Sequence, residues 1–227
     1  MEIEAKLRAP RGAILDAIAG RRRLAGYALR PVGARDLETL YLDTRRHDLL
    51  RAGIAFRIRR APDGVELTIK LPGEIAGVVH RRPELTWRQR RMPELPFVPR
   101  RLALRARLAP WTADRPLWPL VGTRIRRRAL LALRGPGTAP LGEIDLDEVR
   151  FFAPGTAGDR RTSRRSHEVE VELLGGGERD LERLVQALRR DYDLRPALGS
   201  KLVRALRWAG IGPPRRPRGA AASRDSP

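Results

Sequence analysis

Glu2, Glu4 and Lys6 stand at alternate positions of the first segment, the spacing that places side chains on one face of a β-strand. The chain has 47 lysine and arginine residues, but its lysines are Lys6, Lys70 and Lys201 alone. Because arginine serves wherever a cation is merely solvated, each retained ammonium indicates a compact point charge that a guanidinium cannot replace. This usage hints at a phosphate site.

Other charged residues are sorted by sign from one segment to the next. Carboxylates dominate the alternating segments around Asp145 to Asp147 and Glu168 to Glu172, whereas arginines dominate those around residues 57–59 and 124–128. A solvated strand face would mix the two signs to limit repulsion. Clustered carboxylates favour a divalent cation bound through oxygen, most plausibly Mg²⁺ or Mn²⁺, and clustered cations favour phosphates.

The bulk composition is consistent with an anionic ligand. The chain has 227 residues, enough for one sizeable domain or two small ones, and a formal net charge of +20. Such a charge favours nucleic acid, nucleotides, polyphosphate or an anionic membrane surface, without choosing among them. The absence of cysteine excludes a thiolate nucleophile and a cysteine-ligated zinc.

The two ends of the chain differ in character from its middle. The first segment is acidic and lacks an apolar leader, and no stretch approaches the roughly 18 apolar residues of a membrane span. We therefore expect a soluble, cytoplasmic protein. Residues 1–210 read as one domain, and residues 211–227, rich in Pro, Arg, Gly, Ala and Ser, as a disordered basic tail.

Period-two alternation is the commonest pattern along the chain. It predicts eight strands, over residues 2–8, 37–43, 54–59, 65–71, 79–87, 124–133, 143–147 and 168–173. Apolar stripes and turn residues predict helices after Pro10, around residues 49–53 and over residues 102–108, 181–188 and 197–208. The expected fold class is α+β, with an eight-stranded antiparallel sheet closed into a barrel and helices packed outside.

Two orientations of that barrel are open. Charged strand faces in general point outward to solvent around an apolar centre. Here, however, the helices carry apolar stripes that need an apolar outer wall to cover, which favours a charged interior. Each buried ion costs several kcal/mol, so such an interior must be hydrated and occupied. A metal-bound chain of phosphates would satisfy both signs of charge.

A set of motifs then matches a known family in chain order. The motifs are Glu2-x-Glu4-x-Lys6, Tyr41-x-Asp43-Thr44, Leu50 to Gly53 before Arg57-Ile-Arg59, a strand ending in Lys70, Arg82-x-Glu84, Asp147-Glu148, Glu168-x-Glu170-x-Glu172 and Ser200-Lys201. Together they resemble the CYTH superfamily of triphosphate tunnel metalloenzymes, and most of all the bacterial inorganic triphosphatases. The resemblance implies a tunnel that binds Mg²⁺ or Mn²⁺ and hydrolyses inorganic triphosphate to diphosphate and phosphate.

The resemblance also implies roles for individual residues. The expected metal ligands are Glu2, Glu4, Asp145, Asp147, Glu168, Glu170 and Glu172. The expected substrate-binding residues are Lys6, Arg57, Arg59, Lys70, Arg82, Arg126, Arg128 and Lys201. Lys6 and Glu170 are the expected catalytic residues, with Glu168 and Glu172 left open as alternative general bases. In the run 126–128, alternation favours Arg126 and Arg128 and leaves Arg127 outside.

Two other functions compete with this one. The same tunnel could act on thiamine or nucleoside triphosphates, or cyclise ATP as class IV adenylate cyclases do. The chain could also be a non-enzymatic module that binds polyphosphate or nucleic acid, although the carboxylates favour turnover. A small triphosphate is the expected partner and polyphosphate a further candidate, whereas a membrane or a specific nucleic-acid site is not expected. The scattered His47, His80 and His167 lack metal-ligand spacing.

Overall fold

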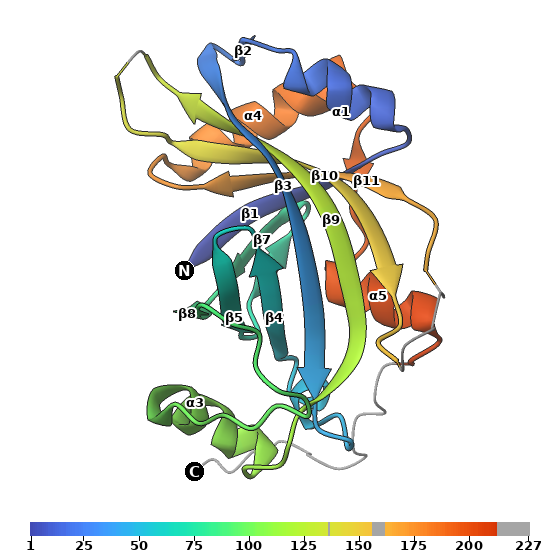
Figure 1. Cartoon of the computed structure of the whole chain (residues 1–227). Coiled ribbons are helices and arrows are strands. Elements are labelled where there is room, and N and C mark those ends of the chain that lie inside the picture. Colours follow the sequence, from blue (N-terminus) through green and yellow to red (C-terminus); the bar gives the residue numbers. More distant parts are fainter. Residues whose placement is uncertain (136, 156–161, 213–227) are drawn as a thin grey trace, which may run out of the picture.

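A curled antiparallel sheet forms the body of the protein in this computed structural model, which describes residues 1–135, 137–155 and 162–212 (Figure 1). Its strands are β1 (Glu2–Ala9), β2 (Arg23–Leu24), β3 (Tyr27–Asp43), β4 (Ala55–Ala61), β5 (Gly64–Lys70), β6 (Glu74–Ala76), β7 (Val79–Arg82), β8 (Glu84–Gln89), β9 (Trp118–Leu133), β10 (Gly142–Phe152), β11 (Ser166–Leu173) and β12 (Arg195–Pro196). Ten of them follow one another in the order β6-β7-β1-β11-β10-β9-β3-β4-β5-β8, while β2 pairs with β3 and β12 with β1.

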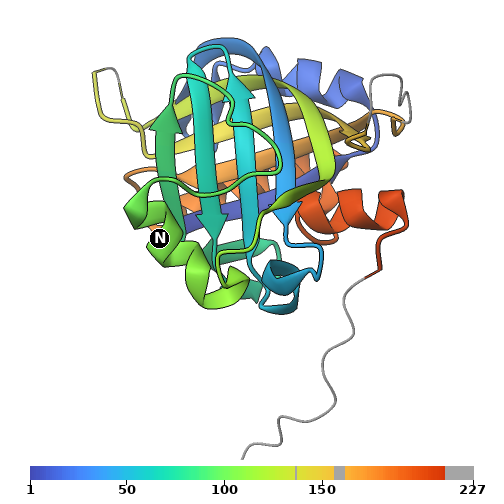
Figure 2. The same ribbon diagram turned by 60° about the horizontal axis from the view of Figure 1, so that its bottom comes forward.

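The two longest strands, β3 and β9, run side by side through the middle of the sheet (Figure 1). Their pairing shifts register between Pro31 and Gly33 and again between Tyr41 and Leu42. Such irregularities bend a strand and increase its twist. Gly33 has a φ of +115°, a conformation that glycine adopts without steric cost. The sheet is strongly curled rather than flat (Figure 2).

The sheet is open, so the expectation of a closed eight-stranded barrel is wrong. The predicted strand 79–87 is two strands, because the chain passes at Pro83 from β7, which pairs with β1, to β8, which pairs with β5. Proline lacks the N–H that a continuous ladder needs. The two halves of the sheet are therefore joined at this corner by the chain itself and by a hydrogen bond from the Leu71 N–H to the Pro83 carbonyl (3.0 Å). The short strands β2, β6 and β12 were not predicted.

Five helices match the predicted segments. They are α1 (Gly12–Ala19), α2 (Asp48–Arg51), α3 (Leu102–Thr112), α4 (Glu178–Asp191) and α5 (Lys201–Ala209). α1 and α4 cover the outer face of β1, β10 and β11, where Leu7 and Val171 are fully buried (Figure 1). α2 and α3 pack with Phe56 and Ile69 on the outer face of β4 and β5. The apolar sides of these strands thus lie beneath helices, as the sequence predicted.

The helix α5 departs from this arrangement because it packs on the inner face of the sheet. Its Leu202, Ala205 and Leu206 share a core cluster with Ile125 of β9 and Val149 of β10. Alternation along a strand puts Ile125 on the same side as Arg127, and Val149 on the same side as Asp147. The apolar stripe of α5 therefore covers one part of an otherwise charged inner face.

Ile211, the first residue of the predicted tail 211–227, contacts the helix α5. The Ile211 N–H donates to the Leu206 carbonyl at 2.9 Å, and its side chain packs against the cluster around α5. The rest of the predicted tail, residues 213–227, lies outside the described residues. Among the described helices, none is long and apolar enough to cross a membrane.

The outer core can be tested at Leu184 of α4, which is fully buried against the sheet. Replacing a buried leucine by alanine removes apolar contacts and leaves a cavity, so Leu184→Ala should lower the free energy of unfolding by about 2–5 kcal/mol. The exposed neighbour Gln186 provides the control, and Gln186→Ala should change it by less than about 0.5 kcal/mol. Urea denaturation measures both. Equal values for the two variants would contradict the packing of α4 described here.

Candidate active site

The inner face of the sheet surrounds a cavity of about 400 Å³. Its walls carry carboxylates and cations from nine strands and from the first turn of α5. The carboxylates are Glu2, Glu4, Glu66, Glu84, Glu143, Asp145, Glu170 and Glu172. The cations are Lys6, Arg35, Arg57, Arg59, Lys70, Arg82, Arg88, Arg127 and Lys201. A wall with this composition can bind a ligand that itself combines both signs of charge.

All three lysines of the chain line this cavity. Lys6, Lys70 and Lys201 are 7%, 8% and 6% exposed, although lysine is rarely buried without a partner. Each ammonium lies 2.7 Å from a carboxylate oxygen, of Glu4, Glu2 and Glu170 respectively. The three lysines are thus internal, whereas the surface cations are arginines. This placement agrees with the scarcity of lysine in the sequence.

One wall of the cavity brings carboxylates together. In the strand register, Glu172 of β11 lies directly opposite Glu4 of β1 on one side and Glu143 of β10 on the other. Burial and the neighbouring charges of Glu2 and Glu4 raise the pKa of Glu172 to about 7. Like charges directly across strands are destabilising, so this row holds negative charge that the protein alone compensates poorly.

Asp145 extends the acidic wall. Burial raises its pKa well above the usual range, with contributions from Asp147 and Glu143, even though Arg127 contacts one of its oxygens. Its second oxygen, Oδ1, is buried and has no hydrogen-bond partner. A buried carboxylate oxygen without a partner carries a large desolvation penalty. Cation binding at this wall would remove that penalty.

The donor set of this wall fits a hard divalent cation. Mg²⁺ and Mn²⁺ prefer carboxylate oxygens, which Glu2, Glu4, Asp145 and Glu172 supply. Within residues 1–135, 137–155 and 162–212, no three such side chains converge at ligand distance. Glu4 contacts Lys6, and both oxygens of Glu2 accept from Lys70 at 2.7 Å. In this structure Glu4 and Glu2 are therefore paired with the ammonium groups of Lys6 and Lys70.

Another part of the lining, on β4 and β9, concentrates positive charge. Arg59 lies near Arg57 and Arg127, and its Nε donates a hydrogen bond to the Thr39 hydroxyl at 3.3 Å. Burial, Arg57 and Arg127 together lower the pKa of Arg59 to about 10, a large shift for a guanidinium. A cation whose charged form is disfavoured in this way is suited to an anionic ligand. Arginine side chains bind phosphate oxygens in pairs through their planar donors.

Between the two walls, Glu170 is enclosed by cations. Its oxygens lie 2.7 Å from Lys201, 3.3 Å from Arg127 and 3.7 Å from Lys6. Burial alone would raise the pKa of this carboxyl, but Lys201 with Lys6 and Arg127 outweighs burial and holds the pKa well below its usual range. Glu170 is therefore a permanent anion that fixes three cations in place.

A second compensated group lies at β5 and β8. Lys70 lies 2.7 Å from Glu84 as well as from Glu2, and Arg57 approaches Glu84 at 3.7 Å. Burial would raise the pKa of Glu84, but Lys70 and Arg57 lower it to about 2. Glu84 thus holds the ammonium of Lys70 and the guanidinium of Arg57 at the edge of the basic wall.

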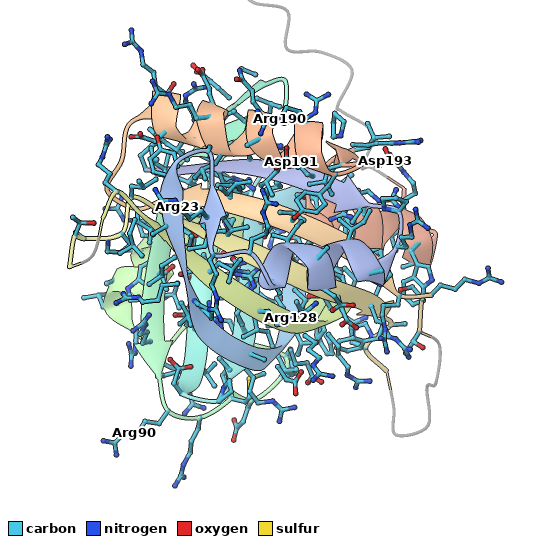
Figure 3. All side chains as sticks on the ribbon, turned by 90° about the horizontal axis from the view of Figure 1, so that it is seen from above. Arg23, Arg90, Arg128, Arg190, Asp191 and Asp193 are labelled. Carbon is cyan, nitrogen blue, oxygen red and sulfur yellow. The ribbon has the colours of Figure 1, made fainter. Side chains whose placement is uncertain are left out.

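The run 126–128 faces the opposite way from the prediction. Arg127 points into the cavity, donating to both oxygens of Asp147 at 2.8 and 2.7 Å. Arg126 and Arg128 lie on the outside, where Arg128 pairs with Asp16 of α1 at 2.8 Å (Figure 3). The prediction took Ile125 as part of an outer apolar side, but Ile125 faces inward beneath α5. Arg126 and Arg128 are therefore not placed to bind the substrate.

Two of the expected metal ligands do not line the cavity. Asp147 is fully buried and is held by Arg127 and Lys201, and Glu168, 1% exposed, is held by Arg204. The other five reach the cavity, as do the expected Lys6, Arg57, Arg59, Lys70, Arg82 and Lys201. The lining residues absent from the expected set are Arg35, Tyr41, Ala55, Glu66, Glu84, Thr86, Arg88, Arg127, Glu143, Ser200 and Leu202. For Glu84 the signal was present, since it alternates with Arg82 and Thr86.

Comparison with known proteins identifies the class. The CYTH domain profile matches residues 1–206, so the chain belongs to the CYTH family. The Hippeastrum protein HpAC1, described as an adenylyl cyclase candidate with a dominant triphosphatase activity, is similar in structure, with a TM-score of 0.61, 18% identity and coverage of 94% of this chain and 98% of that chain.

Two further solved structures share the fold. The PH1819 protein of Pyrococcus horikoshii gives a TM-score of 0.54 at 17% identity, covering 90% of this chain and 98% of its own. A Vibrio parahaemolyticus protein described as an adenylate cyclase candidate gives 0.52 at 15% identity, covering 91% and 97%. No curated protein sequence matches the chain. The structural similarities establish the fold, while the reaction depends on the site.

The acidic wall predicts how stability depends on pH in the absence of divalent cations. The pKa of Glu172 rises from an ordinary 4.5 to about 7 on folding, so the folded state binds more protons than the unfolded state between these values. The stability from this group is fully present below about pH 4.5 and is lost as pH rises through 7. In EDTA, Glu172→Gln should reduce this fall by about 1–2 kcal/mol, allowing for solvent screening. Urea denaturation of the wild type and of Glu172→Gln at pH 5 and 8 tests this prediction. An equal fall in the free energy of unfolding of the two proteins would contradict it.

Proposed function

We propose that this CYTH protein is a metal-dependent phosphoanhydride hydrolase that converts inorganic triphosphate to diphosphate and phosphate. The supporting observation is the pair of like-charge walls in one cavity, with the pKa of Glu172 raised on one side and that of Arg59 lowered on the other. A phosphate chain carrying a divalent cation compensates both walls together. Either ligand alone would leave one wall uncompensated.

The lining favours an inorganic substrate over an organic one. Among the described lining residues, the side chains with substantial apolar surface are Tyr41, Ala55 and Leu202. Organic groups such as a nucleobase are bound by stacking and apolar contact, for which this cavity offers a single aromatic ring. The remaining side chains are polar or charged and suit a chain of phosphates.

Four carboxylates, Glu2, Glu4, Asp145 and Glu172, would hold Mg²⁺ or Mn²⁺. A bound cation of this kind would neutralise charge on the phosphates and lower the pKa of a coordinated water. The basic wall, with Arg57, Arg59 and Arg127, would bind non-bridging oxygens and stabilise the negative charge of the transition state. Lys6, Lys70, Arg82 and Lys201 would complete the binding of the substrate and the leaving diphosphate.

The electrostatics separate the three candidates for the general base. Glu170 is held ionised by Lys201, Lys6 and Arg127, and a carboxylate with so low a pKa is a weak proton acceptor. Both oxygens of Glu168 accept from Arg204 at 2.6 Å. Of the three, Glu172 is the candidate that remains; its pKa of about 7 refers to the cation-free site, and a bound cation would lower it. Glu170 is then the group that holds the catalytic cations in position.

A phosphate-release assay tests the proposed function. With Mg²⁺ or Mn²⁺ the protein should hydrolyse tripolyphosphate at least about tenfold faster than ATP or thiamine triphosphate, since these organic groups gain little from the polar lining. Diphosphate and phosphate should appear in equal amounts, and EDTA should abolish turnover. Faster hydrolysis of an organic triphosphate would support the alternative substrates. Tight binding of tripolyphosphate without turnover in either metal would support the binding module instead.

A pair of arginines tests the inward and outward assignment. Arg59→Met removes a buried cation of the basic wall and should lower kcat/KM for tripolyphosphate about 100-fold or more. Its melting temperature without ligand should not fall, because the lost cation was poorly compensated. Arg126→Met, on the outer face of strand β9, should change kcat/KM less than about twofold. Similar losses in the two variants would contradict the orientation of β9.

A further inference from the structure

A buried, two-pronged ion pair attaches the helix α5 to the sheet. Both terminal nitrogens of Arg204 donate to Glu168 of β11, each at 2.6 Å, and the two side chains are 11% and 1% exposed. The guanidinium lies 6.0 Å from the Phe151 ring of β10, inside the cluster that α5 covers. Paired hydrogen bonds of this kind fix the orientation of both groups.

The first residue of the same helix is Lys201, whose N-cap Ser200 accepts from the Val203 N–H at 3.3 Å. Residues three apart lie on one face of a helix, so Lys201 and Arg204 point together towards β11. The Lys201 ammonium reaches Glu170 at 2.7 Å, Asp147 at 3.0 Å and Glu168 at 3.5 Å. Glu168 therefore contacts both Lys201 and Arg204, and of these two cations only Lys201 lines the cavity.

The remaining contacts of α5 do not fix its position as closely. Leu202, Ala205 and Leu206 bury apolar surface against the sheet, and this stabilisation is non-directional. Sliding or rotation of the helix would preserve much of that burial while moving Lys201 away from Glu170. Apart from the ion pairs of Lys201 itself, the directional contact that resists such motion is the two-pronged pair of Arg204 with Glu168.

We propose that Arg204 and Glu168 form a clasp that positions the Lys201 ammonium at the phosphate chain, so that Arg204 is a positioning residue and Glu168 is not a metal ligand. This inference rests on the proposed function for the identity of the ligand. Arg204 then acts on the ligand through Lys201. The clasp accounts for the full occupation of both Glu168 oxygens.

The test compares Arg204→Lys with Lys201→Met and with the double variant. Lysine keeps the charge but cannot form both hydrogen bonds, so the fold should persist while Lys201 loses its position. Arg204→Lys should lower kcat/KM for tripolyphosphate about tenfold, and Lys201→Met about 100-fold. In the Lys201→Met background, adding Arg204→Lys should change kcat/KM less than about twofold, because Arg204 acts through the missing ammonium. The two single variants should divide their losses of kcat/KM between KM and kcat in the same way.

Arg207→Met is the matched control, since Arg207 is exposed on the same helix, and its kcat/KM should match the wild type. Melting temperatures of all variants show whether each one is folded. A tenfold loss from Arg204→Lys that persists in the Lys201→Met background would overturn the inference, as would an Arg204→Lys variant as active as Arg207→Met. If the wild type bound tripolyphosphate without hydrolysing it, the proposed function would fail. The dissociation constants of tripolyphosphate for the same variants, measured by calorimetry, would then decide the role of Arg204.

Discussion

The burial of unlike charges on opposite walls of one cavity is the constraint on which this structure depends. Ionised groups removed from water are costly unless they are paired, and this interior pairs some of them within the protein and leaves others poorly compensated. Glu170 and Glu84 are stabilised by lysines and arginines, whereas Glu172 and Arg59 shift towards their neutral forms. The poorly compensated groups mark the wall that suits a cation and the wall that suits an anion.

The two faces of the sheet carry different kinds of side chain. The outer side of the sheet carries the apolar contacts with α1, α2, α3 and α4, so the hydrophobic cores that stabilise the protein lie outside the cavity. The inner side is free to carry charge, and the cross-strand register sets Glu172 opposite Glu4 and Glu143. Within the part of the chain that the structure describes, α5 is the helix that contacts the inner face with both apolar and charged side chains. Its apolar residues cover Ile125 and Val149, and its first residue reaches Glu170.

Membership of the CYTH family and the like-charge walls support a triphosphatase, but by different routes. The family match and the structural neighbours establish the fold, whereas the polar lining supports the choice of an inorganic phosphate chain. The reassignment of Glu168 and Glu170 follows from the same geometry. Carboxylates with similar spacing in the sequence have different partners, because Arg204, Lys201 and Arg127 reach some of them and not others.

The sequence alone favoured the inward orientation of the charged faces of β1, β4, β5 and β11, since the apolar stripes of the predicted helices need an apolar outer wall to cover. The scarcity of lysine likewise predicted Lys6, Lys70 and Lys201 as internal groups. Only the tertiary structure decided that the sheet stays open at Pro83, that Arg127 faces inward, and that Asp147 and Glu168 are covered. These features depend on where α5 packs and on which strands pair, and such long-range contacts leave no mark on local periodicity.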